Sequence, residues 1–129
     1  MVDQHGSSGM PAHRYAVVEA RLLAERAATV RRIDGLARQV EGIVESSAWA
    51  TNDDEHDPEG ATVAFERAQV QDLLRQARAE LAEFDSAAGR LRAGTYGRCE
   101  RCGGAIADGR LEALPATRTC IACAESRRR

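Results

Sequence analysis

A repeat of seven residues is the clearest pattern in the first half of the chain. One register of this repeat holds five side chains: Tyr15, Leu22, Thr29, Leu36 and Ile43. Ile33 and Val40 fill the offset positions, and four further residues widen the stripe on one side: Leu23, Val30, Ala37 and Val44. The remaining positions are mostly Arg, Glu and Ala. The spacing predicts an amphipathic helix over residues 15–47, about 50 Å long.

The second half of the chain repeats the pattern more cleanly. Two registers alternate by three and four residues, with Val63, Val70, Ala77, Phe84 and Leu91 in one and Leu74, Leu81 and Ala88 in the other. This alternation is typical of a coiled-coil seam. The pair Asp57-Pro58 predicts the start of the helix, since a carboxylate cap precedes Pro at the first helical position. Gly94 predicts its end, so the helix spans residues 57–93.

Two helices of similar length joined by a polar connection favour an antiparallel hairpin within one chain. A parallel homodimer and an ordinary helical bundle are the alternatives. Aromatic residues make up 4% of the chain, which argues for an elongated helical body and against a broad globular core. No stretch reaches the roughly 18 apolar residues of a membrane span, and the first residues lack the pattern of a secretory signal. We therefore expect a cytoplasmic protein without membrane contact.

Charge is distributed unevenly along the chain. The formal net charge is −2, but residues 48–61 hold five acidic residues and no Arg, whereas residues 98–129 hold seven Arg against four acidic residues. An acidic segment therefore falls at the expected turn of the hairpin, and a basic segment at the C-terminal end.

The four cysteines form two C-x-x-C pairs. Cys99 and Cys102 make the first pair, Cys120 and Cys123 the second, and 17 residues separate the pairs. This spacing predicts one four-thiolate zinc site, which is structural because no coordination position stays open. Two disulfides would need a secreted chain, and a redox dithiol usually comes with a βαβ pattern that is missing here. Three apolar residues are expected to pack around the metal: Ile106, Leu111 and Leu114.

The predicted fold class is therefore mainly α, with a long antiparallel helical hairpin followed by a small four-Cys zinc-finger module. We expect three parts: a flexible N-terminal tail at 1–13, a coiled-coil hairpin at 14–94 with an acidic tip at 50–61, and the zinc module with its basic tail at 95–129.

The cysteine module resembles the DksA/TraR family of C4-type zinc fingers. The residues that carry the resemblance run from Tyr96-Gly97-Arg98-Cys99-Glu100-Arg101-Cys102-Gly103 through Ile106, Arg110-Leu111-Glu112-Ala113 and Pro115 to Cys120-Ile121-Ala122-Cys123. The helical hairpin with its acidic tip is similar in architecture, so the resemblance extends over residues 15–126.

The resemblance implies a bacterial transcription regulator that binds RNA polymerase directly and makes no sequence-specific DNA contact. In this family the coiled coil enters the secondary channel of the polymerase, and acidic tip residues approach the catalytic centre, often together with the alarmone ppGpp. The resemblance thus makes ppGpp a candidate ligand, and from the hairpin within one chain we expect a monomer.

The tip of well-studied family members reads Asp-x-x-Asp-x-Ala. Ungapped counting back from the first cysteine places His56 and Glu59 at the two Asp positions and Ala61 at the Ala position, and a shift of one residue brings Asp57 to the first position. The Asp pair is therefore not reproduced. The resemblance nominates Asp57, Glu59 and Ala61 as partner-binding residues.

Two other classes of function compete with this interpretation. A nucleic-acid-binding or protein-adaptor zinc finger would use the basic C-terminal module, but its excess of charge is modest and it shows no aromatic stacking platform. An enzyme is not predicted, because the sequence shows no catalytic Ser/His/Asp set, P-loop or dinucleotide loop. We therefore expect no catalytic residues.

Overall fold

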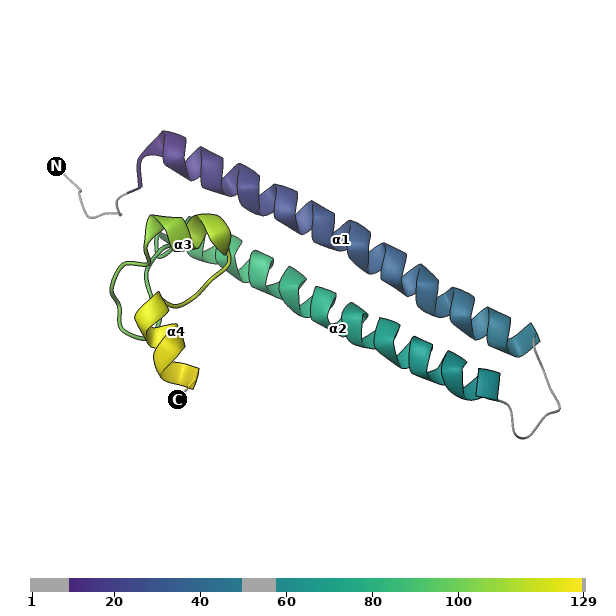
Figure 1. Cartoon of the computed structure of the whole chain (residues 1–129). Helices are drawn as coiled ribbons and strands as arrows, with labels where there is room; N and C mark the ends of the chain where they lie inside the picture. The colour runs from purple at the N-terminus through teal and green to yellow at the C-terminus, as the bar shows by residue number, and fades with distance from the viewer. Residues whose placement is uncertain (1–9, 50–57, 129) are drawn as a thin grey trace. The chain divides into compact units, whose positions relative to one another are not determined.

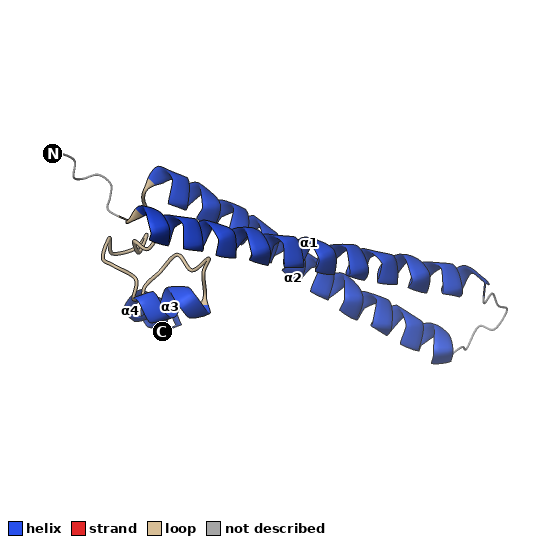
Figure 2. Cartoon of the chain, turned by 90° about the horizontal axis from the view of Figure 1, so that it is seen from above, coloured by secondary structure: helices blue, strands red, loops and turns tan. Residues whose placement is uncertain are grey.

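The computed structural model describes residues 10–49 and 58–128 of the chain. This part contains four helices, α1 (Ala12–Trp49), α2 (Pro58–Ala93), α3 (Asp108–Ala113) and α4 (Ile121–Arg128), as Figure 1 shows. Figure 2 shows the same described residues as helix or loop only, with no strand among them. The predicted fold class is confirmed: two long antiparallel helices precede a small cysteine-bearing module.

Both long helices closely follow the predicted ranges. Helix α1 starts at Ala12 and ends at Trp49, a few residues beyond the predicted limits at each end. Helix α2 starts at Pro58, as the Asp57-Pro58 pair predicts, although Asp57 itself lies outside the described residues.

The end of α2 is a glycine cap. Gly94 has a φ of +83°, which a residue without Cβ adopts readily. Its N–H donates to the carbonyl of Leu91 (3.2 Å), and the N–H of Thr95 donates to the carbonyl of Arg90 (2.9 Å). These two bonds form a Schellman motif, so the stop signal read from Gly94 is confirmed.

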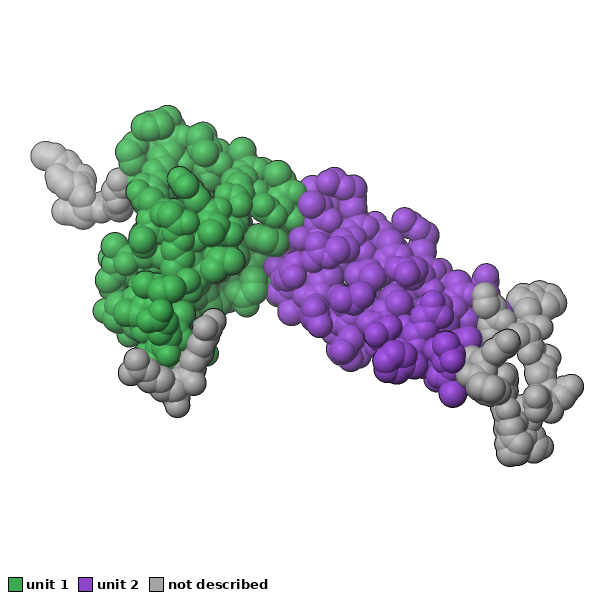
Figure 3. Space-filling view, viewed as in Figure 1, with its two compact units in different colours: residues 1–26, 82–129 green, residues 27–81 purple. Residues whose placement is uncertain are grey.

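The chain divides into two compact units, coloured separately in Figure 3. Unit 1 comprises residues 1–26 and 82–129, and unit 2 comprises residues 27–81. Each unit contains a segment of α1 and a segment of α2, and the cysteine module belongs to unit 1.

Unit 1 holds two clusters of buried residues. In the first, Leu22 of α1 packs with Ala87 and Leu91 of α2, and Arg26 pairs with Asp85 at 2.6 Å. Later residues of α1 thus meet earlier residues of α2, as an antiparallel pair requires. The partly buried side chains around this cluster are Met10, Tyr15, Val18, Phe84, Tyr96 and Ala116. The second cluster belongs to the cysteine module and is described below.

Unit 2 is held together by one narrow seam between its helix segments. Its buried side chains are Thr29, Val70, Leu74 and Ala77. An ion pair between Arg32 and Glu80 joins the two helices at the seam's margin. The seam predicted from the seven-residue repeat is thus confirmed at these four positions.

The predicted widening of the stripe on α1 is wrong at two positions. Leu23 is 60% exposed and Val44 is 41% exposed, whereas Val30 and Ala37 are half-buried. A single partner helix covers only a strip of each helix surface, so apolar residues beside the strip stay in contact with water. None of the helices in the described ranges combines the length and the apolar character that a bilayer crossing needs.

Candidate metal centre

The four cysteine sulfurs gather at one point of unit 1. Their Sγ atoms all lie within 4.8 Å of one another, and none of the four takes part in a disulfide. The two pairs come from different segments, the turn after α2 and the start of α4. The chain therefore does not adopt the alternative of two disulfides.

The first cysteine pair sits in a tight hydrogen-bonded turn. The N–H of Cys99 donates to the carbonyl of Gly104 (2.8 Å), and the N–H of Gly103 donates back to the carbonyl of Cys99 (2.8 Å). Gly103 has a φ of +77°, which favours glycine there. The N–H of Gly104 lies 3.4 Å from the Sγ of Cys102. The turn thus directs backbone donors at the sulfurs.

The second cysteine pair lies at the start of α4. Cys120 directly precedes the helix, and the N–H of Ala124 donates to its carbonyl at 3.0 Å. Cys123 follows within the first turn, so residues three apart project from the same side.

The geometry and the donor set fit zinc. Four sulfurs around a tetrahedral zinc, at bonds of about 2.3 Å, lie roughly 3.8 Å apart. The Sγ atoms of Cys102 and Cys120 are separated by 3.9 Å. Soft thiolates in a tetrahedral set suit zinc far better than calcium or magnesium.

The close approach of the cysteines shifts the pKa of two of them in opposite directions. Backbone N–H groups of Cys102 and Cys120 lower the pKa of Cys99 to about 6. A hydrogen bond with Cys120 raises the pKa of Cys123 to about 12. Thiolates this close repel one another, and a coordinated cation deprotonates them together. The four clustered sulfurs therefore suit a bound cation.

An apolar cluster shields one side of the cysteines. Cys99, Ile106 and Leu111 are its buried members, with the ring of Tyr96 packed against them. Two of the three predicted packing residues are confirmed. The prediction for Leu114 is wrong. This residue is 51% exposed, because its backbone leaves helical geometry at the C-cap of α3 (φ −133°, ψ 79°).

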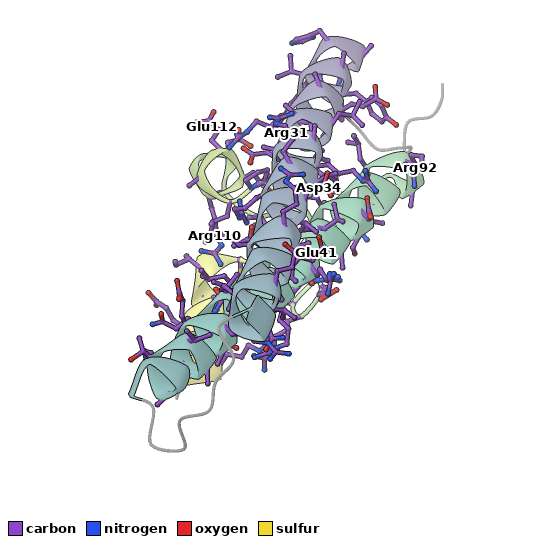
Figure 4. The ribbon with its side chains drawn as sticks, turned by 90° about the vertical axis from the view of Figure 1, so that its right-hand side faces the viewer. Arg31, Asp34, Glu41, Arg92, Arg110 and Glu112 are labelled. Atoms are coloured by element: carbon purple, nitrogen blue, oxygen red, sulfur yellow. The ribbon has the colours of Figure 1, made fainter. Side chains whose placement is uncertain are left out.

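Contacts between the module and the long helices are the part of the site that sequence reasoning missed. On α1, Arg14 pairs with Asp108 (2.8 Å), and Arg21 donates to the carbonyl of Glu112 (2.9 Å). Within the module, the Tyr96 hydroxyl donates to the Pro115 carbonyl (2.9 Å). Figure 4 shows Glu112 and Arg110 on α3 and, at the end of α2, the exposed Arg92. No sequence pattern signals these contacts, because each joins residues far apart in the chain.

The nominated tip residues are not brought into a described site. Asp57 lies outside the described residues, and Glu59 belongs to α2 but its side chain is not described. Ala61 is exposed on the first turns of α2. The tip assignment stays a prediction.

Comparison with known proteins places the module in a family. The model of the prokaryotic dksA/traR C4-type zinc finger matches residues 94–129. An uncharacterized protein of Aquifex aeolicus (strain VF5) is 53% identical over 47 residues, which is 36% of this chain and 32% of that protein. The chain thus matches about a third of the length of this curated relative.

A solved structure shows the same fold over nearly the whole chain. The transcription factor DksA2 from Pseudomonas aeruginosa superimposes with a TM-score of 0.78 at 24% identity, covering 97% of this chain and 91% of that chain. The family match and the four clustered cysteines support a single structural zinc. The resemblance read from the sequence is confirmed: this chain joins a C4-type zinc finger of the prokaryotic DksA/TraR family to a helical hairpin with the DksA2 fold.

Proposed function

We propose that the protein is a DksA-type transcription regulator that binds RNA polymerase directly and inserts its hairpin into the secondary channel. The observation that carries this proposal is the fold shared with a transcription factor over 97% of the chain, together with the family match of the zinc finger. Both point to regulation by binding and not to catalysis by this chain. The cytoplasm and a monomeric state belong to the same proposal.

Zinc has a structural task in this proposal. Cys99, Cys102, Cys120 and Cys123 hold the ion, which completes a module whose apolar cluster is too small to fold alone. The ion supplies folding free energy and takes no part in a reaction, because four thiolates fill its coordination shell.

The tip carries the regulatory effect. Asp57 and Glu59 would bring negative charge to the catalytic metal of the polymerase or to a basic channel wall, and Ala61 would allow close approach beside them. Carboxylates suit Mg²⁺ as ligands but repel nucleic-acid phosphates. The alarmone ppGpp is a candidate co-ligand, and a contact that Lys makes in other family members would here need Arg or be absent, since the sequence has no Lys.

The nucleic-acid alternative draws less support from the module's charges. Two of its seven Arg are engaged inside the fold: Arg110 donates to the carbonyl of Thr119 (2.8 Å), and Arg118 pairs with Glu83 (2.8 Å). Fewer cations are therefore available for phosphates than the composition suggests. Pull-down on core polymerase beside a gel shift on bare DNA separates the two functions.

Charge removal at the tip tests the proposal. In the double variant Asp57→Asn, Glu59→Gln, we expect polymerase binding to stay within about tenfold of wild type, or 1.4 kcal/mol. The change in transcript output from a sensitive promoter should disappear, since the acidic charge delivers the effect. The measurements are a binding titration and in-vitro transcription on the same samples.

The matched control neutralises two neighbouring acids, Asp53→Asn with Asp54→Asn, and should be nearly silent. Full regulatory activity in the Asp57, Glu59 double variant would refute the role of these residues. Failure of the wild-type chain to bind core polymerase would refute the proposed function itself.

A further inference from the structure

The stretch of backbone that leads into Cys120 is held from outside the zinc module. Residues 116–119 connect α3 to the second cysteine pair without helical hydrogen bonds of their own. Arg90 of α2 donates from Nη2 to the carbonyls of Ala116 (3.2 Å) and Thr117 (3.4 Å). A guanidinium on a long helix thus satisfies carbonyls of the segment that positions a cysteine.

Ser86, one turn earlier on α2, joins this arginine to a second one. Its hydroxyl oxygen accepts hydrogen bonds from Nη1 of Arg90 (2.9 Å) and from Nη2 of Arg118 (2.8 Å). Arg118 also pairs with Glu83 on α2 at 2.8 Å. Two neighbouring turns of α2 therefore hold residues 116–118 through both side chains and backbone.

The same contacts reach the first cysteine pair. The N–H of Glu100 donates to the carbonyl of Arg118 (2.9 Å), and the Glu100 carboxylate lies 3.4 Å from Nη1 of Arg118. Glu100 immediately follows Cys99. Arg118 thus links the turn of the first cysteine pair to the loop that leads into the second cysteine pair.

We propose that Arg90 and Ser86 of α2 are positioning residues of the zinc centre. By fixing residues 116–118, they hold Cys120 at the distance from Cys102 that a tetrahedral ion requires. The inference rests on the four-cysteine zinc site of the proposed function, but not on polymerase binding. It makes the end of α2 part of the metal site, although neither residue touches the ion.

The environment of Arg90 explains why its substitution should weaken zinc binding. Its side chain is partly buried, and burial together with the charge of Arg118 lowers the pKa of the guanidinium. A cation in such a place is retained because each of its bonds satisfies an acceptor, and removing it takes a donor from two partly buried carbonyls. Outer groups that orient metal ligands typically change metal affinity by about 10–100-fold when mutated.

Zinc release from the full-length, zinc-loaded protein tests the inference. Transfer of zinc to the chromophoric chelator 4-(2-pyridylazo)resorcinol is followed by absorbance for wild type and Arg90→Gln. We expect release to be about tenfold faster or more in this variant. Arg92→Gln removes an exposed arginine of the same helical turn and should release zinc at the wild-type rate.

Two milder variants keep the test decisive if Arg90→Gln folds poorly. Ser86→Ala removes only the shared hydroxyl and should accelerate release by a few fold. Arg90→Lys keeps the charge, but one ammonium cannot replace a forked donor that bonds three acceptors, so its rate should lie between wild type and Arg90→Gln.

A merely structural role of Arg90 in α2 gives a different result. It would lower the thermal unfolding midpoint of the hairpin while zinc release stays within twofold of wild type in all three variants, and this would overturn the inference. A wild-type protein that holds no zinc would instead refute the metal assignment of the proposed function.

Discussion

Unit 1 and unit 2 use the same two helices but stabilise them differently. In unit 1 the helix segments pack against the zinc module as well as against each other, with two buried clusters that share Tyr96. In unit 2 the described segments of α1 and α2 pack against each other, and Phe65 and Leu73 stay exposed at 66% and 50%. Two buried clusters therefore stabilise unit 1, whereas the stability of unit 2 depends on one seam between two helices.

The polar contacts repeat this contrast. The interhelical ion pair of unit 2, Arg32 with Glu80, is exposed and contributes little, because water screens both charges. Unit 1 instead binds carbonyls of the module with Arg21, Arg90 and Arg110. The metal site, the apolar cluster around it and these arginines thus all belong to unit 1. Amide exchange should accordingly be slowest in unit 1.

Loss of a zinc ligand should have the largest effect on the difference in stability between unit 1 and unit 2. Cys120→Ser is expected to release the metal and unfold residues 95–128, because structural zinc contributes on the order of 10 kcal/mol to folding small sites. The helices of unit 2 should keep part of their circular dichroism, since their seam contains no module residue. Metal analysis and amide exchange on the reduced protein check both points.

A neighbouring substitution controls for changes in α4 alone. Ala122→Ser alters an exposed position between the two cysteines of the second pair and should keep one zinc per chain. Cys120→Ser retaining close to one zinc per chain would contradict the proposed ligand set.

A charge in the seam should be the next largest effect. Leu74 is 8% exposed in unit 2, and Leu74→Asp would bury a carboxylate without a partner, at a cost of about 3 kcal/mol. Leu73 is its neighbour in sequence but is 50% exposed, so Leu73→Asp should change stability by less than about 0.5 kcal/mol. Urea unfolding followed by circular dichroism compares the two, and equal losses would show that the seam is wrongly placed.

Glycine substitutions should give the smallest effects, with opposite signs in the two units. Gly35 of unit 2 lies inside α1 with open space where a Cβ would stand, so Gly35→Ala should stabilise by about 0.5–1 kcal/mol. Gly97 of unit 1 has a φ of +85°, with the Leu111 side chain 3.5 Å from the Cβ position, so Gly97→Ala should destabilise by about 1–2 kcal/mol. Thermal unfolding of both variants tests the signs, and a stabilising Gly97→Ala would contradict the left-handed turn.

The helical seam was predictable because it depends on local periodicity. Val70, Leu74 and Ala77 recur at the spacing that one partner helix covers, and the structure buries all three. The exposed Leu23 shows the limit of this reasoning, because the width of the covered strip depends on how many neighbours the helix has. Ala87 was missed for the same reason: it is fully buried, and the cluster to which it belongs is covered partly by residues of the zinc module.

The sequence by itself determined the two helices, their end signals, the four-cysteine spacing and the resemblance of the cysteine module to the DksA/TraR zinc finger. Each of these depends on residues close together in the chain or on a fixed spacing, so the local chemistry is sufficient. Only the tertiary structure decided that Arg90 donates to a carbonyl of the segment before Cys120, that Ser86 joins Arg90 to Arg118, and that Arg118 contacts α2. A guanidinium can bond any carbonyl within reach, so its choice of partner follows from packing and leaves no periodic trace in the sequence.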